Sequence, residues 1–359
     1  MSENGLAPRW ASAPGETIAA VMTERGIELN QILDDLHVSD TDFGNLIRGQ
    51  MRISPTLADC LSTTFGGSTE FWLIRDAQYR EDLDRVHADE WAQQFPVKQM
   101  SDFGWIKKPK DWHEQIESCL DFFQVETPLQ WESTYKKQFQ HAHYRRSPTF
   151  DINSASTTAW FRACEQQAEL LGPLPAYDAT HFEDSLKDIK RLTRQKDPRK
   201  FIPELVGACA ATGVAVVIVR APEGCPASGA ARQYGNNPLI QLTARHLTDD
   251  HFWFSFFHEA AHVIKDPLDQ TYLDLTDPET GNSQEIAADE FAQQILIPKP
   301  LPPLSNKINA REAIHLAHKN EVSPGVIVGH LQHLGAIPFQ RLNKLKRRYI
   351  WRGVNLEMQ

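Results

Sequence analysis

FWFSFFHEAAHVIK, at residues 252–265, contains the pattern His258-Glu259-x-x-His262. In an α-helix, side chains four residues apart lie on the same face, so both imidazoles can point at one metal ion. Glu259 lies about 100° round the helix axis, where its carboxylate can reach the open coordination position of that ion. The pattern therefore predicts a helix that supplies two metal ligands and a general base.

A second pair of carboxylates follows further along the chain. Glu285 comes 23 residues after His262, and Asp289 comes four residues after Glu285. Glu285 can complete a site of two histidines and one carboxylate that leaves the fourth position of a zinc ion open for water. Asp289 can accept a hydrogen bond from the outer nitrogen of a liganding histidine. We therefore predict one zinc ion, Zn²⁺, held by His258, His262 and Glu285, with Glu259 as the base that activates the metal-bound water.

The segment before this motif predicts a small unit of helix and strand. FIPELVGACAAT at 201–212 reads as a helix that ends at Gly213, and VAVVIV at 214–219 is a β-branched run typical of a buried strand. A Gly/Pro-rich loop, APEGCPASGA at 221–230, precedes a shorter strand, PLIQLT at 238–243. We expect the two strands to form a hairpin ahead of the motif helix.

Two stretches around the motif resemble the ImmA/IrrE family of metallopeptidases. They are ASGAARQYGNNPLIQLTARHLTDDHFWFSFFHEAAHVI at 227–264 and QEIAADEFAQQILIP at 284–298. The order H-E-x-x-H followed by E-x-x-x-D is also similar to the gluzincin arrangement of thermolysin. The resemblance extends over about residues 201–300 and implies a zincin-like fold with the same zinc ligands and the same catalytic glutamate. Ala260-Ala261 departs from the larger or glycine residues common in the family motif, but neither position is a ligand.

The front of the chain predicts a run of short helices. ETIAAVMTER at 16–25 and LNQILDDL at 29–36 precede a third helix, and the turn at 37–39 between short amphipathic helices is the layout of a helix-turn-helix. A Ser-Pro pair at 54–55 begins a further helix, and a fifth helix begins near Ser68.

This front module, over residues 15–80, resembles the helix-turn-helix of HigA-type antitoxins and related repressors. The resemblance rests on APGE at 13–16, ISPTLADCL at 53–61 and STEFWLIRDAQY at 68–79. Members that join such a module to the metallopeptidase domain tend to be antitoxins or transcriptional regulators, and some peptidases of the family cleave a DNA-bound repressor. The resemblance implies a protein partner, such as a repressor or a toxin, with promoter DNA as a further candidate.

DNA contact would depend on the third predicted helix, which would enter the major groove. Asn45, Arg48 and Arg52 are the candidate DNA-contacting residues. Asp40 and Asp42 on the same helix would repel the phosphates that supply most of the affinity. The module is therefore equally consistent with a docking or dimerisation domain that does not bind DNA.

Composition and charge argue against several classes of protein. The 359 residues carry a net charge of −10, which argues against a nonspecific nucleic-acid binder. Residues 1–90 hold 16 Asp/Glu and seven Arg, whereas the basic tail at 341–352 holds six Lys/Arg and no acidic residue. That tail either contacts nucleic acid or a partner, or forms the solvated face of a terminal helix. The five scattered cysteines indicate neither a disulfide framework nor a thiolate zinc site.

We expect a mainly helical α+β protein in three parts. These are a helix-turn-helix module over 1–92, a helical middle region over 93–200, and a zinc metallopeptidase domain with a small sheet and the basic tail over 201–359. No apolar stretch is long enough to cross a bilayer, and the start of the chain has neither a basic nor an apolar leader. We therefore expect a cytoplasmic protein with no membrane partner.

The leading hypothesis for function is a regulatory endopeptidase that cleaves one protein partner, such as a repressor or a toxin. The alternative is a HigA-like antitoxin and repressor that binds its toxin and promoter DNA, with the metal site structural or inactive. Both hypotheses are compatible with a homodimer. An endopeptidase also needs a group that stabilises the oxyanion, and the sequence does not rank the candidates. They are Tyr272, His315, His318, His330 and His333.

Overall fold

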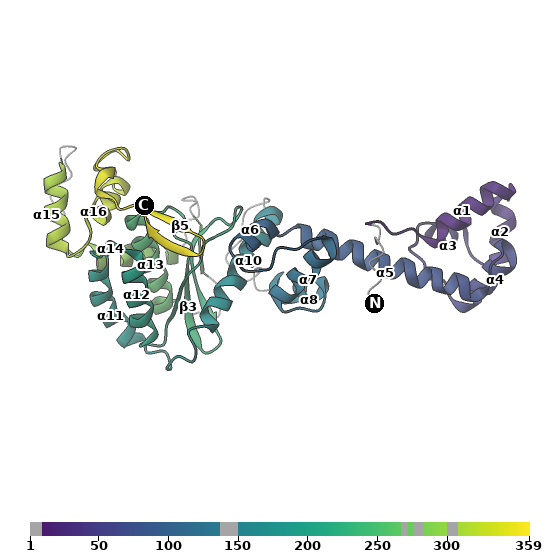
Figure 1. Cartoon of the computed structure of the whole chain (residues 1–359), viewed down its shortest axis with the longest axis horizontal. Helices are drawn as coiled ribbons and strands as arrows, with labels where there is room; N and C mark the ends of the chain where they lie inside the picture. The colour runs from purple at the N-terminus through teal and green to yellow at the C-terminus, as the bar shows by residue number, and fades with distance from the viewer. Residues whose placement is uncertain (1–8, 137–149, 267–271, 276–282, 300–307) are drawn as a thin grey trace. The chain divides into compact units, whose positions relative to one another are not determined.

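The computed structural model describes residues 9–136, 150–266, 272–275, 283–299 and 308–359 (Figure 1). The chain is mainly helical with a small sheet, as the sequence predicts. Its internal contacts divide it into two compact units, Met1–Gln93 and Gln94–Gln359. Within the described ranges, no helix combines the length and the apolar character that crossing a bilayer requires.

The first unit is a bundle of helices around one apolar core, in which Trp72 is 2% exposed. Short polar residues begin two of its helices. The Ser39 hydroxyl accepts a hydrogen bond from the Asp42 amide at 3.1 Å, and the Ser54 hydroxyl accepts one from the Leu57 amide at 3.2 Å. The helices are α1 (Pro14–Arg25), α2 (Leu29–Leu36), α3 (Asp40–Ile47), α4 (Pro55–Phe65) and α5 (Thr69–Gln93).

The second unit places helices on both faces of a four-stranded sheet and ends in a two-stranded hairpin. Its strands are β1 (Ala215–Ile218), β2 (Ala227–Tyr234), β3 (Asn237–Leu242), β4 (Tyr272–Leu275), β5 (Tyr349–Arg352) and β6 (Asn355–Met358). Its helices are α6 (Val97–Asp102), α7 (Trp112–Phe123), α8 (Pro128–Trp131), η1 (Glu132–Lys136), α10 (Phe150–Glu169), α11 (Ala179–Leu192), α12 (Pro198–Ala210), α13 (Asp249–Lys265), α14 (Ser283–Leu296), α15 (Ala310–Asn320), α16 (Pro324–His333) and η2 (Asn343–Leu345).

The strand order of the larger sheet is β1-β3-β2-β4. Strand β1 runs parallel to β3, and β2 runs antiparallel to both β3 and β4. The predicted hairpin between 214–219 and 238–243 is therefore wrong, because β3 forms its hairpin with β2 through a turn at Gly235, where φ is +59°. The first residues of β2 were predicted as part of a loop. Their run of alanine, serine and glycine has a low strand propensity, so no local signal marked them.

Strand β2 brings helix α13 close to one face of the sheet. Successive side chains of a strand point to opposite faces. Ala231 points into the main core beneath α13, where Trp253, Phe256 and Phe257 of the helix are fully buried. Small side chains on the strand leave room for these large aromatic side chains on the helix.

The neighbouring residue on β2, Arg232, points to the other face of the sheet and meets helix α10. Its guanidinium donates to Glu165 at 2.8 Å and to Gln241 at 3.0 Å. Glu165 also accepts from Arg162 at 3.1 Å, and all four side chains are buried. Burying these charges is tolerable because each cation meets a carboxylate. The network fixes α10 against the sheet.

The basic tail at 341–352 contains the short 3-10 helix η2 and strand β5 of the terminal hairpin, and two of its cations are used within the unit. The Arg347 guanidinium donates to the backbone carbonyls of Thr193, Arg194 and Gln195 at the end of α11. Lys346 pairs with Asp250 of α13 at 2.6 Å. These two side chains therefore stabilise the fold, so the expectation of a solvated helix face is wrong for them.

The start of α13 is held by the buried carboxylate of Asp249. Its two oxygens accept hydrogen bonds from the Ser323 hydroxyl at 2.7 Å and from the Arg347 amide at 2.9 Å. A β-carbon on Gly325 would clash with this carboxylate, so α16 packs here at a distance that only glycine permits. Burial raises the pKa of Asp249 to about 6, although the hydrogen bond from Ser323 opposes the shift.

The substitution Asp249→Asn should remove a pH dependence of stability. The folded-state pKa of about 6 lies above the ordinary value of 3.8. The proton on Asp249 therefore stabilises the folded protein in acid, and this contribution is lost as the pH rises from about 4 through about 6. In urea unfolding, the free energy of unfolding of the wild type minus that of the variant should fall by about 2 kcal/mol between about pH 4 and pH 7. A difference that stays constant with pH would contradict this assignment.

The substitution Glu165→Ala should lower the free energy of unfolding by about 3 to 5 kcal/mol, because it removes the carboxylate shared by two buried guanidinium groups. The control is Glu169→Ala. Glu169 also contacts Arg162, but its side chain is 48% exposed, so its loss should cost less. Urea unfolding of both variants measures the difference, and equal effects would show that Glu165 is not the centre of the network.

Candidate metal centre

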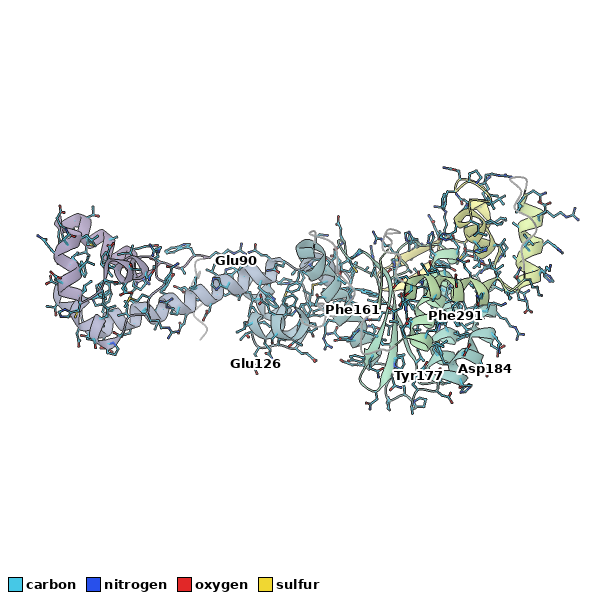
Figure 2. The ribbon with its side chains drawn as sticks, turned by 180° about the vertical axis from the view of Figure 1, so that it is seen from behind. Glu90, Glu126, Phe161, Tyr177, Asp184 and Phe291 are labelled. Atoms are coloured by element: carbon cyan, nitrogen blue, oxygen red, sulfur yellow. The ribbon has the colours of Figure 1, made fainter. Side chains whose placement is uncertain are left out.

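Helix α13 places all three functional residues of the H-E-x-x-H pattern inside the core. His258, Glu259 and His262 are 3%, 0% and 1% exposed. Next to them, the hydroxyl of Tyr177, labelled in Figure 2, donates to the Val263 carbonyl of α13 at 3.1 Å. The three side chains therefore start from a helix that is fixed by packing and by a hydrogen bond.

Helix α14 brings a third donor, Glu285, to the two imidazoles. Nε2 of His258 lies 3.2 Å from Nε2 of His262 and 3.1 Å from Oε2 of Glu285, and Nε2 of His262 lies 3.7 Å from Oε1 of Glu285. Tetrahedral zinc with bonds of about 2.0 to 2.2 Å holds neighbouring ligand atoms roughly 3.4 Å apart. These three side chains therefore match the spacing and the donor chemistry of one zinc ion.

Each imidazole presents its outer nitrogen to a carboxylate. Nδ1 of His258 lies 2.8 Å from Oδ1 of Asp289, the residue that the sequence suggested for this contact. Nδ1 of His262 lies 2.8 Å from Oδ2 of Asp266. This contact is not among the sequence-based predictions. The spacing of four residues after His262 could have indicated it, because such residues share one face of a helix. A carboxylate at Nδ1 fixes the tautomer that leaves the Nε2 lone pair available to a metal.

The carboxyl group of Glu285 is suited to be an anionic ligand. Burial opposes its ionisation, but hydrogen bonds with His258 and His262 outweigh burial and lower its pKa to about 2. Glu285 is therefore ionised at neutral pH. An ionised carboxylate with two neutral imidazoles is a common ligand set for zinc in hydrolases.

Gly229 of β2 makes the space that Glu259 occupies. A β-carbon at this position would lie 2.6 Å from Oε1 and 2.9 Å from Cγ of Glu259, closer than real β-carbons approach. No sequence pattern singles out Gly229, because residues 221–230 have the Gly/Pro-rich composition of a loop. The close approach shows that β2 and α13 together set the position of the predicted general base.

The candidates for oxyanion stabilisation fall on three different elements. Tyr272 lies on β4, where it pairs with Ala231 of β2, so its backbone is on the strand next to the one that carries Gly229. The histidines at 315 and 318 lie on α15, and those at 330 and 333 lie on α16. Within the described part of the chain, none of these four histidines joins the group of potential metal ligands.

The candidate DNA-contacting residues lie in the first unit. Arg48 ends α3 and donates to Asn45 Oδ1 at 2.9 Å, and Arg48 and Arg52 are both exposed. Asp40 and Asp42 are exposed at the start of α3. Because these carboxylates repel phosphate, the geometry of α3 adds no argument for promoter DNA.

Comparison with known proteins agrees with the location of the metal centre. No curated protein and no solved structure matches the chain significantly. Residues 213–331 match the family model of the IrrE N-terminal-like domain, Peptidase_M78, and this range includes α13 and α14 with the three candidate ligands and Glu259. This part of the chain is therefore similar to the ImmA/IrrE metallopeptidases.

Proposed function

We propose that the second unit is a zinc-dependent regulatory endopeptidase that cleaves a specific protein partner, such as a repressor or a toxin. The observation that carries the proposal is the grouping of His258, His262 and Glu285 at zinc-ligand spacing, with the buried carboxylate of Glu259 on the same helix. The match of residues 213–331 to a metallopeptidase family supports the same conclusion.

A zinc ion in this site would supply Lewis acidity, which polarises a peptide carbonyl and makes a water molecule more acidic. The protein supplies the proton transfers. Glu259 would accept a proton from the attacking water and pass it to the leaving amine, a role that typically contributes about 100-fold to 10,000-fold in rate. Asp266 and Asp289 would orient the imidazoles through their Nδ1 atoms.

The ligand count favours a catalytic site over a structural one. Structural zinc sites usually use four protein ligands, and catalytic sites use three and leave one position open. Within the described residues, three side chains form the potential ligand group. A buried glutamate beside the ligands has a use in hydrolysis and none in a closed structural site.

The substitution Glu259→Gln should lower zinc-dependent cleavage of a proteome-derived peptide library at least about 100-fold, because it removes the general base. Zinc content, measured by mass spectrometry of the metal, should not change, since Glu259 is not a ligand. Glu290→Gln, an exposed glutamate on the same α14 helix that carries Glu285, is the matched control and should retain activity. Full activity of Glu259→Gln would rule out the proposed mechanism.

The substitutions Asp266→Asn and Asp289→Asn should each weaken zinc binding about 10-fold to 100-fold, because an amide at Nδ1 orients the imidazole less well than a carboxylate. Competition with a zinc chelator of known affinity measures the effect. Asp184→Asn, an exposed residue labelled in Figure 2, serves as the control. If zinc affinity is unchanged in both site variants, these carboxylates do not support the ligands.

A further inference from the structure

The helix face that carries the metal ligands continues toward the start of α13. His251, Ser255 and Glu259 are spaced by four residues, so their side chains follow one another along this face. Four residues of helix rise about 6 Å, so Ser255 lies about one turn from the general base and His251 about two turns. Any group bound beside these two side chains would lie on the same side of α13 as the proposed reaction.

A small, open pocket with an enclosed volume of about 10 Å³ lies at this position. Its floor contains apolar side chains and the Ser255 hydroxyl, and its rim consists of exposed polar side chains. The lining residues are Ser228, Leu242, Ala244, Arg245, His246, His251, Phe252 and Ser255. This volume holds about one water-sized group, so the pocket could receive one oxygen of a carboxylate whose other atoms lie at the rim.

The rim of the pocket carries the fixed positive charge of one arginine beside two imidazoles. Arg245, His246 and His251 are exposed there, and the two imidazole rings stack with their centroids 4.2 Å apart. The Arg245 guanidinium also donates to the backbone carbonyl of Pro226, which ties this side chain to the start of β2. Of the eight described lining residues, none is acidic.

The nearest carboxylate does not cancel this charge. Oδ2 of Asp250 lies 4.0 Å from Nε2 of His251, but the same oxygen pairs with Lys346 at 2.6 Å. Partial burial lowers the pKa of His246, and repulsion from His251 and Arg245 lowers it further, against a smaller opposing effect of Asp250. The lowered pKa keeps His246 neutral at neutral pH, so the positive charge that favours an anion comes from Arg245, and the neutral ring of His246 can still donate one N–H hydrogen bond.

We propose that this pocket, defined by Arg245, His246, His251 and Ser255, is a specificity subsite that binds a carboxylate of the substrate peptide. The inference rests on the proposed peptidase function and adds a substrate class to it. An extended peptide advances about 3.3 Å per residue, and the pocket extends from about 6 Å (Ser255) to about 12 Å (His251) along α13 from Glu259. The bound carboxylate therefore belongs to a residue about two to four positions from the scissile bond.

The carboxylate has two sources, the side chain of Asp or Glu and the free C-terminus of a chain. Both would meet the same Arg245 guanidinium and the same imidazoles, which recognise carboxylates through charge-assisted hydrogen bonds. A peptide array with free and amidated C-termini separates them. Enrichment that survives amidation identifies an acidic side chain, and enrichment that needs the free end identifies a terminal carboxylate.

The test uses the full-length, zinc-loaded Glu259→Gln protein, so binding is measured without cleavage. We expect the array to enrich a carboxylate at one fixed position, and Arg245→Gln or His251→Gln in that background to weaken binding of the enriched peptides about 10-fold or more. Arg191→Gln, an exposed arginine on α11, is the matched control and should leave binding unchanged. Unchanged zinc content and circular dichroism show that the variants are folded.

Three results overturn the inference: no enrichment of a carboxylate, no binding above background, or enrichment that both pocket variants retain. A different result would contradict the proposed peptidase function and leave the carboxylate site in place. If the wild-type protein shows no zinc-dependent cleavage while carboxylate enrichment is present and depends on Arg245, the pocket is a carboxylate site in a protein that is not a peptidase. Cleavage without any preference for a carboxylate rejects the subsite alone.

Discussion

The convergence of α13 and α14 is the constraint on which the proposed chemistry depends. It brings Glu285 within 3.1 Å of a histidine that lies 27 residues earlier in the chain. Asp266, Asp289 and Glu259 add three further carboxylates around the same two imidazoles. So many acidic groups in a partly buried space are costly unless a cation compensates them. The proposed divalent ion would account both for the ligand spacing and for this concentration of negative charge.

The sheet contributes precision to this arrangement. Strand β2 has a low strand propensity, because alanine and glycine pack little surface against their neighbours. Its small residues are needed for packing: Gly229 allows the carboxylate of Glu259 to lie against the strand, and Ala231 leaves room for the aromatic residues of α13. A general base held by backbone contact varies little in position, which is what proton transfer across one hydrogen bond requires.

The C-terminal segment fixes the other end of the same helix. Asp249 joins the start of α13 to Ser323 of α16 and to the backbone of Arg347, while Lys346 pairs with Asp250. Of the six cations in the tail, Lys346 holds α13 through Asp250, and the guanidinium of Arg347 holds the end of α11. Helix α13 is therefore fixed at its first turn and at Val263. The two proposed histidine ligands and the α13 residues of the carboxylate pocket lie between these points.

The sequence alone predicted the helix that carries His258 and His262 and the contact of Asp289 with His258, because helical periodicity acts over four-residue spacings. The role of Glu285 as a metal ligand stays a prediction, which its position beside both imidazoles supports. Serine residues also located the starts of α3 and α4 in the first unit. Strand β2, the approach of Gly229 to Glu259, the contact of Asp266 and the folding of the basic tail depended on the tertiary structure. These features arise from packing between distant segments, and such packing overrides local propensity without leaving a periodic pattern in the sequence.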